Sequence, residues 1–179
     1  MQLPRSRWMF AIIWLCWIGG ASAGDALSEY KLGAGDKIAI YVFEEPDLSM
    51  EYTLSDAGTI SYPFLGEIRV LGSTVGELEN RITAGLKGPY LVDPKINVTI
   101  KEYRQFYIHG EVTKSGGYSF QPGLTLRKAI SIAGGLTERA SEKKIFIIHD
   151  SDPSKEKRQA GMDEPVFPGD TITVEQSFF

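Results

Sequence analysis

Cysteine is almost absent from this chain of 179 residues. The one cysteine, Cys16, lies in an apolar run close to the N-terminus, and no thiol follows it. The rest of the chain therefore forms no disulfide, no thiolate metal site and no cysteine nucleophile. Cys16 itself does not match a lipid-bearing cysteine, because the bulky residues Trp14 and Leu15 precede it where lipoprotein cleavage requires small ones.

Histidine is scarce as well, and neither of the two histidines belongs to a catalytic or metal-binding pattern. His109 and His149 each fall on an expected strand, without a carboxylate at the spacing of metal ligands, so a structural role is the better interpretation. Carboxylates are plentiful but show no acid–base pairing. Gly33-Ala34-Gly35 lacks the third glycine and the following helix of a dinucleotide-binding loop. We therefore predict neither an enzyme nor a cofactor site.

Positive charge is in deficit, with 19 Lys and Arg against 23 Asp and Glu, which gives a net charge of −4 at pH 7. The first 23 residues hold two arginines and no acid, so their removal would change the net charge from −4 to −6. Phosphate binding needs a basic face, and we therefore expect no nucleic-acid partner. A hydrophobic content of 42% indicates a folded chain with a real core.

The first 23 residues have the pattern of a secretory signal peptide. The pattern consists of Arg5 and Arg7, an apolar run over residues 8–18, and the small residues Ala21-Ser22-Ala23. The apolar run is shorter than the about 20 residues that span a bilayer. We predict cleavage before Gly24 and export to the periplasm, with an uncleaved anchor as the alternative.

Alternating apolar and polar residues predict short strands in the first half of the chain. The expected strands cover residues 37–43, 52–54, 59–62, 66–70 and 96–101. Residues 55–58, with the sequence Ser-Asp-Ala-Gly, are typical of a tight hairpin turn between the second and third strands. Thr74 and Glu77 have the spacing of a capping box and predict a helix that ends near Lys87.

The second half follows a similar order of elements. Strands are expected up to Gly110 and at residues 118–120, 144–149 and 171–175, with an exposed loop at residues 150–162. The turn Pro168-Gly169-Asp170 before the last strand resembles Gly35-Asp36 before the first one.

A short helix is expected in the middle of the second half. Thr125 is predicted to cap its start with the side-chain hydroxyl, and Gly134-Gly135 to end it, since glycine reaches the left-handed conformation of a helix C-cap. One apolar face at helical spacing is formed by Leu126, Ala129, Ile130 and Ala133.

These residues together resemble a known family. The second half carries Gly110-Glu111-Val112, Gly117-Tyr118, Thr125-Leu126, Ala129-Ile130 and Ala133-Gly134-Gly135, and this order resembles the SLBB motif. The first half carries Tyr30-Lys31-Leu32-Gly33-Ala34-Gly35-Asp36, Ser55-Asp56-Ala57-Gly58-Thr59-Ile60, Pro63-Phe64-Leu65-Gly66 and Asp93-Pro94-Lys95-Ile96-Asn97-Val98. That half is similar to the domain which precedes SLBB modules in outer-membrane polysaccharide export proteins.

The resemblance implies an α+β fold, with a small mixed β-sheet export domain at residues 24–104 and a β-grasp-like SLBB domain at residues 105–179. It also implies a periplasmic component of a ring-shaped channel, associated with the outer membrane, for capsular or extracellular polysaccharide. The implied partners are an inner-membrane polysaccharide co-polymerase and copies of the chain itself. The expected form is a short one without a lipobox or a C-terminal membrane helix, so a separate outer-membrane β-barrel partner is also expected.

Two other functions remain open at this point. A monomeric periplasmic SLBB module could bind a soluble ligand or act as an adaptor, and oligomeric state would separate it from a ring subunit. An enzyme acting on the polysaccharide is disfavoured because no acid–base pair is evident.

Surface turns and tyrosines are the candidate contacts for polysaccharide or a partner, since aromatic faces stack on sugars and polar groups bond their hydroxyls. Tyrosines considered for sugar contact are Tyr62, Tyr90, Tyr103, Tyr107 and Tyr118. The predicted contact residues are Asp56, Gly58, Tyr62, Pro63, Gly66, Gly117 and Tyr118.

Overall fold

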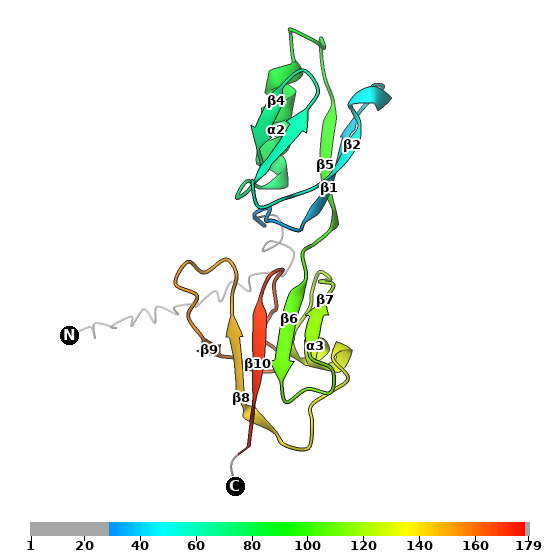
Figure 1. Ribbon diagram of the computed structural model, residues 1–179. Coiled ribbons are helices and arrows are strands. Elements are labelled where there is room, and N and C mark those ends of the chain that lie inside the picture. The colour runs from blue at the N-terminus through cyan, green and yellow to red at the C-terminus, as the bar shows by residue number, and fades with distance from the viewer. Residues whose placement is uncertain (1–28, 178–179) are drawn as a thin grey trace, which may run out of the picture.

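Two separate hydrophobic cores lie along the chain (Figure 1). The computed structural model describes residues 29–177. We call residues 30–102 the N-terminal unit and residues 105–176 the C-terminal unit, because each range contains one of the two cores. The domain boundary after residue 104 stays a prediction.

The N-terminal unit combines a three-stranded sheet, a separate β-hairpin and one helix. Its elements are β1 (Lys37–Val42), the 3-10 turn η1 (Pro46–Leu48), β2 (Met50–Thr53), β3 (Thr59–Tyr62), β4 (Gly66–Arg69), α2 (Val75–Leu86) and β5 (Ile96–Glu102). The sheet has the antiparallel order β2-β1-β5, and β3 pairs with β4. Helix α2 buries its apolar face against this arrangement.

The predicted capping box of α2 is confirmed. The Glu77 N–H donates to Thr74 Oγ1 at 3.2 Å, and the Thr74 N–H donates to Glu77 Oε2 at 2.9 Å. Two N–H groups that lack helical partners are satisfied in this way. The buried residues Leu78 and Ile82 then follow at helical spacing.

The predicted hairpin between β2 and β3 is wrong. A turn does occur at residues 55–58, where the Gly58 N–H donates to the Ser55 carbonyl at 3.1 Å. However, β2 pairs with β1 and β3 pairs with β4, so the turn carries the chain between two sheets. The Gly58 carbonyl accepts the N–H groups of Val70 and Leu71, which ties the turn to the end of β4. Turn chemistry alone does not reveal which strands pair.

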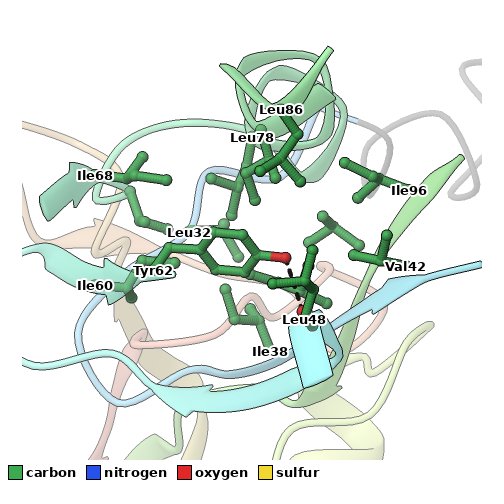
Figure 2. Close-up of a cluster of buried hydrophobic side chains, with 14 of the residues drawn as sticks. Leu32, Ile38, Val42, Leu48, Ile60, Tyr62, Ile68, Leu78, Leu86 and Ile96 are labelled. Carbon is green, nitrogen blue, oxygen red and sulfur yellow. Dashed lines mark hydrogen bonds between the residues drawn. The ribbon is translucent and has the colours of Figure 1, made fainter. Parts of the chain in front are cut away.

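Tyr62 lies inside the core of the N-terminal unit. Figure 2 shows its ring among aliphatic side chains from the strands and from α2, with a hydrogen bond at its far end. The hydroxyl donates to the Leu48 carbonyl at 2.7 Å. Burial raises the pKa of Tyr62 to about 12, and the hydrogen bond satisfies the one polar atom of the ring.

The C-terminal unit is a five-stranded sheet with one helix. Its elements are β6 (Phe106–Gly110), β7 (Gly116–Tyr118), α3 (Leu126–Ile132), β8 (Ala140–Ile148), β9 (Arg158–Gln159) and β10 (Thr171–Gln176). The order is β7-β6-β10-β8-β9, with β10 parallel to β6 and antiparallel to β8. The unit is therefore a mixed sheet, and the α+β prediction is confirmed for the described chain.

Two predicted elements of this unit need correction. The short strand expected at residues 118–120 is β7, two residues earlier, because β6 begins at Phe106, which pairs with Tyr118 and leaves no β6 partner for residues 119–120. The loop expected at residues 150–162 contains β9, which pairs with β8. The β8 strand is also longer than expected and starts at Ala140.

Helix α3 has the predicted apolar face but a different cap. Thr125 stands at the N-cap position without a side-chain hydrogen bond to the helix. The N–H groups of Leu126 and Arg127 donate instead to the backbone carbonyls of Glu164 and Met162, at 2.9 and 2.8 Å. These carbonyls lie 35 and 38 positions further along the chain and take the place of the Thr125 hydroxyl, so the predicted Thr125 cap bond is wrong.

Two positive-φ glycines end α3 as predicted, at φ values of 85° and 89° for Gly134 and Gly135. Neither helix in the described part of the chain has the length and apolar character needed to cross a bilayer.

Candidate functional site: the joint between the two units

Three residues separate the last strand of the N-terminal unit from the first strand of the C-terminal unit. Figure 1 shows the units placed end to end with this segment between them. The ring of Tyr103 packs edge-to-face against Tyr30 on one side and Phe120 on the other, each with 5.2 Å between ring centroids. Aromatic packing therefore continues from one unit into the other.

Arg104 bridges the two units with its guanidinium group. Its Nη1 donates to the Tyr30 hydroxyl at 2.5 Å and lies 3.3 Å from Asp36 Oδ2, both in the N-terminal unit. Its Nη2 donates to Asp150 Oδ2 at 2.9 Å, in the C-terminal unit. The Arg104 side chain is only 16% exposed and Asp36 is fully buried, so solvent screens this pair little. We call these four residues the joint.

Two Gly-Asp turns of the same construction frame the joint. The buried carboxylate of Asp36 accepts the Gly33 N–H at 2.7 Å, and that of Asp170 accepts the Phe167 N–H at 2.8 Å. In each turn the second carboxylate oxygen accepts the N–H of a residue just past the neighbouring strand. This donor is Arg104 for Asp36, at 2.8 Å, and Asp150 for Asp170, at 3.1 Å. The similarity predicted for these two turns is confirmed.

Glycine is required before each aspartate. Gly35 has a φ of +93° and Gly169 a φ of +87°, a region that residues with a Cβ rarely adopt. A Cβ at Gly169 would lie 2.7 Å from Arg104 Nε and 2.8 Å from Asp150 Cβ. The close approach of backbone and side chains at the joint therefore depends on the absence of a side chain there.

The electrostatic setting of the two turns differs. Burial, together with the hydrogen bond to Asp36, raises the pKa of Tyr30 well above its ordinary value. Burial also raises the pKa of Asp170, although the Phe167 N–H and His149 Nδ1, at 2.8 Å, partly offset that effect. For Asp150, burial is outweighed by hydrogen bonds from Lys155 and Arg104, and the net effect lowers its pKa. Within the joint, the pKa of Tyr30 is thus raised and that of Asp150 is lowered, so the phenol stays neutral and the Asp150 carboxylate stays charged at neutral pH.

Two open clefts border the joint, with volumes of about 950 and 880 Å³. The larger is lined by residues that include Tyr30, Asp56, Arg69, Leu71, Arg104, Asp150 and Phe167. The smaller is lined by residues that include Tyr103, Gln105, Tyr107, Ser119, Phe120 and Pro122. Rings, carboxylates, guanidinium groups and amides in one cleft can contact both the apolar faces and the hydroxyls of a sugar.

The predicted contact residues are spread over three places. Asp56 is exposed and lines the larger cleft, whereas Gly58 is buried in the turn beside it. Pro63 lies in the turn after β3, Gly66 begins β4, and Tyr62 is buried at the end of β3. Gly117 and Tyr118 belong to β7 in the C-terminal unit, where the Tyr118 ring stacks on Phe106. Their contact role stays a prediction, and Tyr62 offers no ring face to a ligand.

Sequence reasoning missed the partners of Asp36. Arg104 and Tyr30 are distant from each other in the chain, and nothing in their local pattern indicates pairing. The repeated Gly-Asp turn was visible in the sequence, but the structure was needed to show that the antiparallel neighbour of the following strand ends two residues before a charged residue in both cases. These residues are Arg104 and Asp150, and they pair with each other.

Both histidines have a structural partner within the C-terminal unit. His149 lies against Asp170, and His109 Nε2 lies 3.0 Å from Thr173 Oγ1. Within residues 29–177, no cluster of three or more His, Cys, Asp or Glu side chains could hold a metal ion.

Comparison with known proteins matches each half of the chain to a protein family model. Residues 25–101 match the family model described as polysaccharide biosynthesis/export protein, and residues 105–159 match the SLBB domain. The polysaccharide export family is a transport family and not a catalytic one.

Two curated relatives agree with these matches. The chain is 35% identical over 129 residues to the exopolysaccharide production protein ExoF of Rhizobium meliloti, which covers 65% of this chain and 30% of that protein. It is 26% identical over 181 residues to the EPS I polysaccharide export outer membrane protein EpsA of Ralstonia nicotianae, which covers 82% of this chain and 47% of that protein. The chain thus spans less than half the length of either relative. An export domain followed by one SLBB domain places this chain in the family of outer-membrane polysaccharide export proteins.

Proposed function

We propose that this chain is a periplasmic subunit of a conduit that carries capsular or extracellular polysaccharide across the cell envelope. Several copies would form a ring around the path of the polymer. The observation that carries the proposal is the succession of an export domain and an SLBB domain in one chain. Export would depend on the predicted signal peptide, residues 1–23, which lie outside the described residues.

The geometry of the joint supports a subunit of defined shape. A ring wall needs subunits that hold one orientation, and a closed ring needs head-to-tail contacts between unlike surfaces. In this chain the units are connected by three residues, by aromatic packing through Tyr103 and by the Arg104 bridge. A change in the orientation of the units would leave the buried Arg104 guanidinium without its carboxylate partners, which costs free energy. The bridge therefore favours a single orientation of the two units relative to each other.

The proposed partners are the polymer itself, an inner-membrane polysaccharide co-polymerase and a protein of the outer membrane. The polymer would touch many weak sites, because a translocating chain must leave each site that it enters. The clefts beside the joint offer polar and aromatic groups for contacts of this kind.

Deletion of the gene tests the proposal when polysaccharide is measured separately in the medium and in the periplasm. We expect secreted polymer to be lost, with polymer retained behind the outer membrane, and secretion to return when the full-length gene is restored. Unchanged secretion in the deletion strain would contradict an export role.

Oligomeric state distinguishes the conduit from an adaptor. The clefts beside the joint would also suit a monomeric ligand-binding module. Analytical ultracentrifugation of the purified exported chain, with and without membrane extract from the deletion strain, should give a closed oligomer for the conduit. A monomer under both conditions would favour the adaptor.

A further inference from the structure

Two aromatic rings stand exposed at the end of the N-terminal unit that lies farthest from the C-terminal unit. Phe64 belongs to the turn between β3 and β4, and Tyr90 to the loop between α2 and β5, which Figure 1 places at that end. The rings stack with 4.7 Å between centroids and an angle of 25° between planes. Phe64 is nevertheless 62% exposed and Tyr90 48% exposed. We call this pair the aromatic platform.

The backbone of Phe64 is strained, because the turn between β3 and β4 holds this residue at a positive φ. The Leu65 N–H donates to the Tyr62 carbonyl at 3.2 Å, which closes a turn with Pro63 in second place and Phe64 in third. Phe64 has a φ of +65°, and this combination is a type II turn, whose third position normally holds glycine. A bulky residue with positive φ is an outlier that often marks a functional site. The ring that this strained residue carries lies mostly outside the core.

The loop that carries Tyr90 is held firmly by its own backbone. The N–H groups of Tyr90 and Leu91 both donate to the Leu86 carbonyl at the end of α2, at 3.2 and 2.9 Å. The Gly88 N–H donates to the Leu91 carbonyl at 2.7 Å. The Tyr90 hydroxyl also reaches the Phe64 carbonyl at 3.5 Å. The platform is therefore built in advance, so a ligand need not order it on binding.

We propose that the aromatic platform is a stacking site for a sugar ring of the exported polysaccharide. Because the two rings cover each other on one side, a ligand can stack only on an outer face, and such a flat apolar face matches the apolar face of a pyranose ring. An exposed ion pair between Lys87 and Asp93, at 3.8 Å, lies in the same loop and supplies a donor and an acceptor for sugar hydroxyls. This inference rests on the proposed function, since the family relationship is what makes a polysaccharide the expected ligand.

A protein partner fits this surface less well. In the same loop only Val92 adds a further large exposed apolar side chain, and protein interfaces of standard size bury about 800 Å² on each partner. A platform of two rings beside an ion pair matches a single sugar residue better. Weak binding at such a site also suits a polymer that must move on.

Affinity electrophoresis tests the contact directly. The probe is the polysaccharide purified from the culture medium of the strain that carries the gene, cast into a native gel. We expect the polymer to retard the full exported chain, and the Phe64→Ala/Tyr90→Ala variant to bind roughly three- to tenfold more weakly. The matched control is Tyr41→Ala, which removes another ring of the same unit, 55% exposed on β1, and should bind like the wild type.

A second variant separates ligand binding from folding. Phe64→Gly removes the ring and relieves the unfavourable backbone conformation together, so the melting temperature should stay equal or rise while the polymer retards the variant less than the wild type. The ring-conserving variants Phe64→Tyr and Tyr90→Phe should keep the retardation. A melting temperature several degrees lower for Phe64→Gly would show that the ring serves the fold and would overturn the inference.

Other outcomes are equally decisive. If the polymer does not retard the wild type, or retards the double variant equally, the platform is not a sugar site. If the double variant binds polymer normally but no longer forms oligomers, the platform is a contact between copies, and the inference is again overturned. Affinity electrophoresis measures polysaccharide binding by the purified chain, whereas the gene deletion measures polysaccharide secretion. Failure of the inference and failure of the proposed function are therefore distinguishable.

Discussion

The turns around Asp36 and Asp170 have one backbone design and two different roles. Both buried carboxylates accept an N–H from three residues earlier and another from the end of a neighbouring strand. Asp170 completes its contacts with His149, inside its own unit. Asp36 completes them with Tyr30 and the Arg104 side chain, which continues to Asp150 across the joint.

The difference shows how one turn becomes either internal or connecting. The side chains around each carboxylate make the difference, because the Arg104 side chain binds the Asp36 carboxylate while His149 occupies the equivalent place beside Asp170. A long cationic side chain at position 104 reaches the acidic side chain at position 150. Arg104 carries five donors in a planar group, which suits it to bind partners on both sides at once.

Removing each carboxylate in turn should give the largest difference in stability between the two turns. We expect Asp36→Ala to lower the free energy of unfolding by about 3–5 kcal/mol, since it leaves the buried Arg104 charge without its closest countercharge in the N-terminal unit. Asp170→Ala should cost less, about 1–3 kcal/mol, because it leaves mainly backbone N–H groups and one histidine without an acceptor. Urea denaturation at neutral pH measures both. Equal losses, or a larger loss at position 170, would contradict the comparison.

Substitution of the glycine that precedes each aspartate should have an intermediate effect on stability. Gly35→Ala and Gly169→Ala should each cost about 1–2 kcal/mol of unfolding free energy, because alanine must adopt a positive φ. The loss at position 169 should be the larger, since its Cβ would meet Asp150 Cβ at 2.8 Å, whereas the nearest atom to a Cβ at position 35 lies at 3.3 Å. Thermal unfolding of the two variants checks the order. Gly116→Ala, where a Cβ would meet open space, serves as the control.

Alkaline pH should destabilise the fold through Tyr30, which binds the Asp36 carboxylate, and this effect should be the smallest of the three. The pKa of Tyr30 is raised in the folded chain, so its contribution to stability is present below pH 10, the ordinary pKa, and is lost as pH rises beyond it. Tyr30→Phe should cost about 1 kcal/mol at neutral pH through the lost hydrogen bonds. Above about pH 10 its stability should fall less steeply than that of the wild type. Parallel curves, measured by denaturation at several pH values, would contradict this role.

Local patterns predicted much of this fold because the interactions behind them are local. The Thr74–Glu77 capping box joins residues three apart, and the apolar face of α3 follows from helical spacing. The Thr125 cap failed because carbonyls of Glu164 and Met162 reach the same N–H groups from far along the chain. For the candidate sites, sequence reasoning indicated the Pro63–Gly66 turn and Tyr90, but it had no means of showing that Phe64 and Tyr90 stack.

The sequence by itself determined the family, the α+β class and the presence of two similar Gly-Asp turns, because motif residues and periodicity are properties of short segments. Only the tertiary structure decided that Arg104 joins Asp36 to Asp150, that Tyr62 is buried, and that Phe64 and Tyr90 form one surface. These contacts link residues 14 to 68 positions apart. They depend on how strands pair and on how the two units meet, and turn or strand propensity carries no information about either.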